Sequence, residues 1–179
     1  MKFIETPLRD LFIVESQIFN DKRGSFQRIH CNFEFAKLGF DETFTQMNLS
    51  TNENANTLRG LHYQNSPHQE DKLVRCVHGA ILDVVIDLRT GSPTRGQHYM
   101  IEMSSENAIA LLVPKGFAHG YLTLTDGAVI LYKVSTPYMP CSEGGVRWND
   151  PQFAIPWPVK DPIISAKDAG WPDYTDIAS

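Results

Sequence analysis

The sequence predicts a mostly β protein, a sandwich or barrel with a few short helices. Short segments rich in β-branched and aromatic residues follow one another from about residue 44 to residue 134. Turn-forming residues separate these segments, and one short stretch has the pattern of a helix. Many short strands with few helices are typical of sandwiches and barrels.

Residues 1–43 are predicted to form the N-terminal strands and one helix. Residues 11–14 and 17–19 are expected to be extended, and residues 20–24 carry a turn signal before a further strand at residues 25–28. The helix is expected at residues 32–39, because Asn32 can cap its start and Gly39 its end.

Residues 44–136 are predicted to form the barrel core. Residues 44–50 alternate apolar with polar side chains, and residues 80–87 are rich in β-branched side chains, so that Leu82, Val84 and Ile86 face away from Asp83, Val85 and Asp87. Thr125-Asp126-Gly127 is a hairpin signal. Further strands are expected at residues 98–103, 109–113, 117–124 and 128–135.

Residues 137–179 are rich in proline, glycine and tryptophan. Trp148, Trp157 and Trp171 are expected to cover a sheet or to pack on a partner chain. Repeats and an interdomain linker are missing from the sequence, so we expect one domain over residues 1–179.

Composition excludes several classes of protein. The net charge of −5 argues against a nucleic-acid binder that depends on a positive field. The sequence also lacks an apolar stretch long enough to span a membrane, and its first residues do not resemble a secretory signal. Cys31, Cys76 and Cys141 are odd in number and far apart, which favours a reducing, cytoplasmic setting over a disulfide framework.

Residues 57–64, with residues 72–75 shortly after them, concentrate basic and polar side chains among strand formers. A histidine beside a glycine, on a face that also carries an amide, indicates a pocket wall; the alternative is a buried histidine bonded to the backbone. Side chains alternate along a strand. One face therefore takes Arg59, Leu61 and Tyr63, and the other takes Gly60, His62 and Gln64.

Pro114-x-Gly116-x-x-His119 resembles the second motif of the cupin barrels, which are jelly-roll double-stranded β-helices. Many cupins bind a metal through an H-x-H pair, a glutamate and a histidine at the position of His119. Here the first motif reads His62-Tyr63-Gln64, and the glutamate has no clear counterpart. The resemblance therefore implies a cupin-like jelly-roll barrel with no metal and no cofactor.

A series of further motifs resembles the dTDP-4-dehydrorhamnose 3,5-epimerase family, in order over almost the whole chain. The resemblance implies an isomerase that inverts C3, C5 or both in a nucleotide-linked 4-keto-6-deoxyhexose. It also implies a homodimer in which N-terminal strands bring Arg23 and Phe26 into the partner's pocket. The motifs are Asp21-x-Arg23-Gly24-x-Phe26, Gln46-x-Asn48, residues 58–64, residues 72–75, residues 114–120, Tyr132-Lys133, Tyr138-x-Pro140, residues 148–150 and residues 165–168.

The same resemblance implies four catalytic residues. His62 matches the general base, and Asp168 the carboxylate that pairs with it, although Asp83 is a rival partner and Asp168 could instead cap a helix. Lys72 matches the residue that stabilises the enolate oxygen; the alternative is a solvated surface lysine. Tyr132 matches the acid on the opposite side of the sugar; the alternative is a core tyrosine.

Substrate-binding positions are also implied. Arg23 and Arg59 match residues that hold the diphosphate, and Phe26 can stack on a base. The family usually has a glutamate that receives thymine where this chain has Arg28, so a CDP- or GDP-linked sugar is an open alternative. Gln46, Asn48, His119 and Tyr138 match pocket positions around the sugar, or are structural polar groups.

Three other functions stay open from the sequence. One is a C3-only epimerase or a 4-keto-sugar isomerase with the same framework. A second is a metal-dependent cupin oxygenase with His62, His119 and His68 as ligands. The third is a non-catalytic sugar-nucleotide binding module, although binding alone does not call for a base, carboxylate, lysine and tyrosine together.

Overall fold

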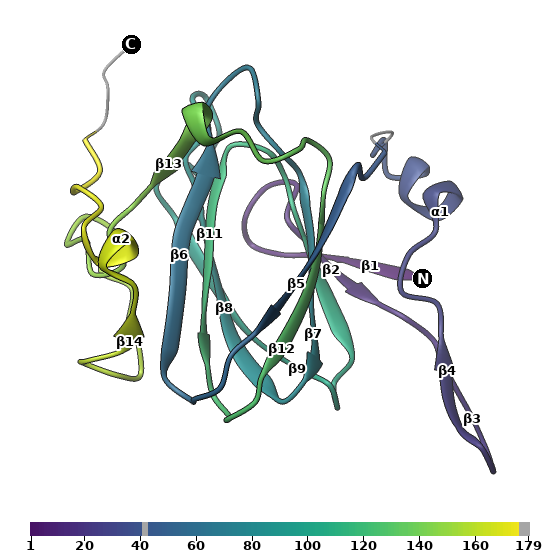
Figure 1. Cartoon of the computed structure of the whole chain (residues 1–179). Helices are drawn as coiled ribbons and strands as arrows, with labels where there is room; N and C mark the ends of the chain where they lie inside the picture. The colour runs from purple at the N-terminus through teal and green to yellow at the C-terminus, as the bar shows by residue number, and fades with distance from the viewer. Residues whose placement is uncertain (41–42, 176–179) are drawn as a thin grey trace.

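Two large β-sheets face each other across the body of the protein (Figure 1). The computed structural model describes residues 1–40 and 43–175, so residues 41–42 and 176–179 of the predicted domain lie outside the described residues. The first sheet has the order β1-β2-β10-β7-β12-β5. Its strands are β1 (Lys2–Glu5), β2 (Phe12–Glu15), β10 (Ile109–Val113), β7 (Lys72–His78), β12 (Val129–Val134) and β5 (Gln46–Thr51).

The second sheet has the order β13-β6-β11-β8-β9, and β14 pairs in parallel with β6. From β7 to β12 the chain passes repeatedly between the two sheets, which is the winding of a jelly roll. The predicted mostly β, cupin-like jelly-roll fold is therefore confirmed. The strands of this sheet are β13 (Glu143–Gly145), β6 (Thr57–Gln64), β11 (Phe117–Thr123), β8 (Ala80–Asp87), β9 (His98–Ser104) and β14 (Ile163–Ile164).

A two-stranded hairpin extends from the body of the protein (Figure 1). It consists of β3 (Ile18–Asp21) and β4 (Gly24–Gln27), with the predicted turn between them. Phe19 and Phe26 are opposite each other in this hairpin and are 55% and 70% exposed. An exposed aromatic pair on a projecting hairpin is typical of a surface that meets another molecule.

Thr125-Asp126-Gly127 does not close a hairpin, and this prediction is wrong. The turn joins β11 to β12, but β11 pairs with β6 and β8 whereas β12 pairs with β5 and β7. Turn residues predict that the chain reverses. They do not predict which strand it pairs with afterwards, because pairing depends on the long-range winding of the two sheets.

Within the part of the chain that the structure describes, three apolar clusters hold the layers together. The central cluster lies between the sheets and includes Val74, Val85 and Ile130, all fully buried. A second cluster contains Val84 and Ile86 on the opposite face of β8, where Phe153, Trp157 and Tyr174 of the C-terminal segment pack. The predicted alternation of side chains along β8 is thus confirmed. A third cluster lies under the helix α1 (Asn32–Ala36) and includes Val14, Phe35, Leu73, Ala110 and Leu112.

The helix α1 is shorter than predicted, and the predicted cap is wrong. Cys31 occupies the N-cap position without a side-chain cap bond, and Asn32 is already the first helical residue. The helix ends at Ala36, before the predicted Gly39. Phe35 sets this register, because its ring is buried against Phe3 and other aromatic rings. The other helical segments are the 3-10 turn η1 (Pro140–Ser142) and α2 (Ala166–Ala169).

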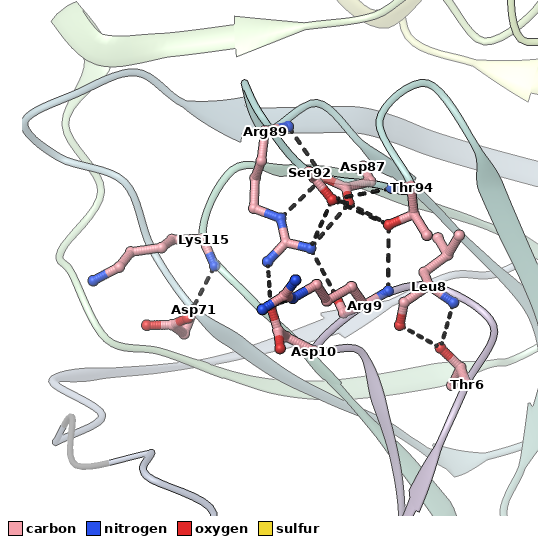
Figure 2. Close-up of polar contacts among 10 residues, drawn as sticks. All are labelled: Thr6, Leu8, Arg9, Asp10, Asp71, Asp87, Arg89, Ser92, Thr94 and Lys115. Atoms are coloured by element: carbon pink, nitrogen blue, oxygen red, sulfur yellow. Dashed lines mark hydrogen bonds and ion pairs between the residues drawn. The ribbon is translucent and has the colours of Figure 1, made fainter.

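A buried polar network joins the end of β8 to the N-terminal loop (Figure 2). Asp87 accepts hydrogen bonds from Arg89, Ser92 and Thr94 and is completely buried. The Arg89 guanidinium also bonds Asp10 at 2.8 Å and lies 4.7 Å from the ring centroid of Phe117. These contacts fix the loop between β8 and β9 against the loop between β1 and β2 and against the start of β11.

Candidate active site

An irregularity in β6 places Arg59 and His62 on the same side of the sheet. His62 pairs with His119, and Arg59 pairs with Tyr121. Between these two pairs β6 advances by three residues whereas β11 advances by two, so β6 contains one extra residue. Gly60 lies at this bulge with φ +120°, and a Cβ atom there would be 2.6 Å from the Cα of Gly120. The predicted alternation that placed Arg59 opposite His62 is therefore wrong, because a bulge adds one residue and switches the face.

His62 and Asp168 form a hydrogen-bonded pair, as the family resemblance implies. His62 Nε2 is 2.7 Å from Asp168 Oδ1, while Asp168 Oδ2 accepts the backbone N–H of Gly60 at 3.2 Å. Burial alone would raise the pKa of Asp168, but the hydrogen bond and charge of His62 hold it below its ordinary value. Ser165, not Asp168, caps α2, since its Oγ accepts the Asp168 backbone N–H.

Asp83 pairs with a different histidine, which removes it as the partner of His62. His119 Nε2 is 2.9 Å from Asp83 Oδ2, and both side chains are buried. Burial raises the pKa of Asp83, and the nearby His119 opposes that shift. Two histidine–carboxylate pairs therefore lie side by side, with His62 and His119 on directly paired positions of β6 and β11, Asp83 on β8 and Asp168 on α2.

Lys72 enters the pocket from the first sheet. Its side chain is only 9% exposed, which contradicts the surface-lysine alternative. Lys72 Nζ donates to the backbone carbonyl of His62 at 3.2 Å and forms an ion pair with Glu70 at 3.1 Å. Gln64 in turn donates to Glu70 and accepts the Met139 backbone N–H. A cation is thus held within the pocket by one carboxylate and one carbonyl.

Tyr132 reaches the same region from β12, opposite the strand of His62. Burial raises the pKa of Tyr132, which keeps the phenol protonated at neutral pH. A cavity of about 350 Å³ separates the two sheets at this point. Its lining includes the predicted residues His62, Lys72, Tyr132, Gln46, Asn48 and Tyr138, together with Glu70 and Glu143.

Arg59 and His119 line an adjoining cavity that also contacts His62, Lys72 and Tyr132. Arg59 Nε donates to the side-chain carbonyl of Asn52 at 2.8 Å, which fixes the guanidinium. Nine of the twelve predicted site residues therefore meet around two joined cavities or, for Asp168, bond directly to a residue that lines them.

Arg23, Phe26 and Arg28 do not reach this pocket within their own chain. Arg23 and Phe26 lie on the projecting hairpin, where Arg23 pairs with Asp21. Arg28 forms an ion pair with Glu34 at 3.0 Å, so its side chain is directed toward α1. These three predicted positions require a second chain if they are to contact the same ligand.

Sequence reasoning missed two carboxylates of the pocket, Glu70 and Glu143. Glu143 accepts hydrogen bonds from Tyr138 at 3.0 Å and from Lys167 at 2.6 and 2.7 Å. Glu143 follows a proline-rich segment without strand periodicity, so no sequence pattern indicated that its side chain lies in the pocket. Glu70 is two residues before Lys72. This spacing is the sequence feature that could have indicated a carboxylate near the lysine.

The three histidines of the metal-cupin alternative are not arranged as one ligand set. His68 Nδ1 bonds Ser142 Oγ at 2.8 Å, whereas His62 and His119 each bond a separate aspartate. Within residues 1–40 and 43–175, no group of three histidine, cysteine or acidic side chains is arranged to hold a metal ion. Over the same residues, no helix is both long and apolar enough to cross a membrane.

Comparison with known proteins agrees with the geometry of the pocket. The dTDP-4-dehydrorhamnose 3,5-epimerase family matches residues 5–176. The protein of that name from Salmonella typhimurium is 43% identical over 174 residues, 96% of this chain and 94% of the relative. The Bacillus anthracis structure of that name, with TDP and pyrophosphate bound, has a TM-score of 0.94 at 43% identity and covers 97% of this chain and 99% of its own.

A second solved structure adds a sugar nucleotide. The dTDP-6-deoxy-D-glucose-3,5-epimerase from Legionella pneumophila, in complex with dTDP-4-keto-L-rhamnose, has a TM-score of 0.89 and 37% identity. It covers 97% of this chain and 98% of its own. The chain belongs to the dTDP-4-dehydrorhamnose 3,5-epimerase family.

Proposed function

We propose that this enzyme inverts C3 and C5 of a dTDP-linked 4-keto-6-deoxyhexose with His62, Lys72 and Tyr132 as catalytic residues. The observation that carries the proposal is the arrangement of the cavity. His62, bonded to Asp168 of α2, lies on one sheet, and a buried lysine and a protonated tyrosine approach from the other. The C3 and C5 protons are acidic because each carbon is next to the C4 ketone.

The tautomer of His62 follows from its partner. An ionised carboxylate can only accept hydrogen bonds, so Nε2 carries a proton toward Asp168 and Nδ1 holds the free electron pair. His62 Nδ1 takes the proton from carbon, and the electron pair of the broken C–H bond moves to the C4 oxygen. Asp168 stabilises the imidazolium that forms. Lys72 stabilises the enolate oxygen, as a preorganised cation does for developing negative charge.

Tyr132 then returns a proton to the opposite face of the same carbon. The phenol loses this proton while the enolate electrons form the new C–H bond and the C4 ketone is restored. The net result is inversion with one proton gained by His62 and one lost by Tyr132, and exchange with solvent resets both groups. This sequence of steps uses groups of the protein alone.

The nucleotide part of the substrate is assigned from the relatives. Two solved structures, one with TDP bound and one with dTDP-4-keto-L-rhamnose bound, are 43% and 37% identical to this chain, which favours dTDP over the CDP and GDP alternatives. The Arg28 side chain pairs with Glu34 and leaves thymine recognition to other residues. Arg59 is placed beside the catalytic groups and is suited to a phosphate oxygen.

The enzyme is further proposed to act as a homodimer. The hairpin exposes Phe19 and Phe26 at its surface, and the edge strand β5 exposes Met47 and Leu49 on its outer face. Burying these side chains against a second copy would remove apolar area from water. The same contact would carry Arg23 and Phe26 to the partner's pocket.

A cytoplasmic location is proposed from the three free cysteines and the nucleotide-sugar substrate.

The function is tested by NMR in deuterated water with the 4-keto-6-deoxyglucose sugar on dTDP, CDP and GDP in turn. We expect deuterium at both C3 and C5 with the dTDP sugar. The His62→Ala variant should lose exchange at both carbons, whereas His98→Ala, at a histidine on β9 outside the pocket, should keep it. Exchange at C3 alone would reassign the enzyme as a C3 epimerase, and no exchange would reject the function.

The dimer has a separate test by mixing two inactive variants. Arg23→Ala and His62→Ala chains are unfolded together and refolded, so that mixed dimers form. A mixed dimer then holds one complete site, with His62 from one chain and Arg23 from the other, and activity should return. Monomers in sedimentation, or no recovery in the mixture, would contradict the shared site.

A further inference from the structure

Lys167 lies next to Asp168 in the chain but does not line the pocket. Its Nζ atom bonds both carboxylate oxygens of Glu143, at 2.6 and 2.7 Å. Neighbouring residues of α2 thus reach two different partners: Asp168 bonds His62, and Lys167 bonds Glu143. The proposed mechanism gives a role to Asp168 and none to Lys167.

The helix α2 has only four residues and cannot hold its own position. An isolated helix this short is unstable in water, because few backbone hydrogen bonds form for the residues that must be ordered. Its place must therefore come from contacts with the rest of the protein. The Ser165 cap is internal to the segment and does not attach it to the barrel.

Besides the Gly60 N–H bond to Asp168 and the pairing of β14 with β6, two contacts fix the segment to β13, which pairs with the strand of the base. Glu143 lies on β13, which pairs with β6 so that Glu143 is opposite Gln64 and Gly145 is opposite His62. The Trp171 ring packs on Gly145 so closely that a Cβ atom there would lie 2.2 Å from the ring. The Lys167 ion pair and the Trp171 contact thus reach the strand that pairs with the His62 segment.

Glu143 links this contact to the pocket. Tyr138, which lines the cavity, donates to Glu143 Oε2 at 3.0 Å. Burial alone would raise the pKa of Glu143, but the hydrogen bonds from Lys167 and Tyr138 lower it, so the carboxylate is ionised at neutral pH. One carboxylate therefore holds a lysine on one side and a pocket tyrosine on the other.

We propose, on the basis of the function proposed above, that Lys167 is a positioning residue whose ion pair with Glu143 holds Asp168 against His62. The pair aligns the carboxylate with Nε2 and so keeps Nδ1 directed at the substrate carbon. Without it, α2 keeps its cap, the Trp171 contact, the Gly60 bond and the β14 pairing, but loses the contact that fixes its Lys167 side to β13. A shift of about 1 Å at a catalytic group can reduce the rate on the order of 100-fold.

The test compares Lys167→Met, Lys167→Arg and Lys160→Met in the full-length enzyme. Methionine keeps the length of lysine without its charge, and Lys160 is an exposed lysine of the same C-terminal segment. We expect kcat of Lys167→Met to fall about tenfold with KM nearly unchanged, since an alignment defect acts on the chemical step more than on binding. Lys167→Arg should recover most of the rate, and Lys160→Met should match the wild type.

Two further readouts separate positioning from a general loss of structure. ¹⁵N NMR of the His62 ring should show one dominant neutral tautomer in the wild type and a mixture in Lys167→Met, and the kcat–pH profile should change with it. The double variant Lys167→Met/Glu143→Gln should be no slower than the slower single variant, because both remove the same contact.

The outcomes are distinct from those of the proposed function. If the wild type exchanges neither C3 nor C5, the function itself fails. If the wild type is active and Lys167→Met matches it in kcat, pH profile and tautomer, the positioning role is wrong. Additive losses in the double variant, or a His62 tautomer unchanged despite a low kcat, would also overturn it.

Discussion

Replacing Asp87 with asparagine tests how the buried network of Figure 2 supports the barrel. Asp87 is completely buried and ends β8, the strand that also carries Asp83 beside His119. Its carboxylate accepts the Arg89 guanidinium at 2.9 and 3.0 Å and the hydroxyls of Ser92 and Thr94 at 2.6 and 2.7 Å. Asparagine would remove the negative charge. It would also place an NH₂ group, which is itself a donor, against the donors of Arg89, Ser92 and Thr94.

The size of the effect follows from the shift in pKa. Burial alone would raise the pKa of Asp87, but the hydrogen bonds from Arg89, Ser92 and Thr94 lower it from 3.8 to about 2. At about 1.4 kcal/mol per pKa unit, the ionised carboxylate stabilises the folded state by about 2.5 kcal/mol at pH 7. Because the folded pKa is the lower one, this contribution is full well above pH 3.8 and is lost as the pH falls toward 2.

Urea denaturation measures this contribution directly. At fixed protein concentration, Asp87→Asn should lower the free energy of unfolding by about 2.5 kcal/mol at pH 7 and by about half as much at pH 3. Asp161→Asn, at an exposed position, is the matched control and should stay close to the wild type. A loss below about 1 kcal/mol at pH 7, or one that does not shrink at low pH, would refute the reasoning.

Three more substitutions test the site. Tyr132→Phe should abolish turnover while the proton transfer from the substrate carbon to His62 continues. NMR should then show hydrogen exchange without inversion. Normal inversion would contradict the role of Tyr132 as the acid. Lys72→Met should lower kcat on the order of 100- to 1,000-fold in steady-state assays, and a loss under tenfold would contradict enolate stabilisation. Gly120→Ala would place a Cβ atom 2.6 Å from the Arg59 carbonyl oxygen and 2.9 Å from the Leu61 side chain. This overlap should destabilise the fold by about 1–3 kcal/mol, measured by thermal melts. An unchanged Tm would show that the backbone at the bulge adjusts to the added methyl group.

Local patterns predicted most strands, because alternation and β-branched runs reflect burial that each strand keeps in the fold. The predicted range 80–87 matches β8, and 109–113 matches β10. Three strands escaped prediction: β1, which covers only Lys2–Glu5, and two others that lack such a pattern. β13 contains two glycines in three residues, and β14 has only two residues. Both exist because β6 offers them a free edge, which is a property of the assembled sheet.

Most of the residues that line the cavity were predictable from the sequence, whereas residue spacing alone did not decide which aspartate pairs with His62. Asp83 and Asp168 were both candidates for His62, and nothing in their spacing separates them. The choice depends on β11, which brings His119 beside His62 so that Asp83 on β8 meets His119 instead. Asp168 reaches His62 from a segment 106 residues later in the chain. Such distances are set by sheet order, which no local pattern encodes.

Inversion at carbon requires two protein surfaces that face opposite sides of the substrate, and the jelly roll supplies them. In the proposed mechanism the base belongs to β6 of the second sheet, while the lysine and the tyrosine belong to β7 and β12 of the first. A sugar ring bound between the sheets presents one face to each. A proton that leaves toward His62 and returns from Tyr132 has therefore changed faces without any rotation of the ring. The stereochemical result thus follows from which sheet carries which side chain, and exchanging the two roles would require residues on the opposite sheet.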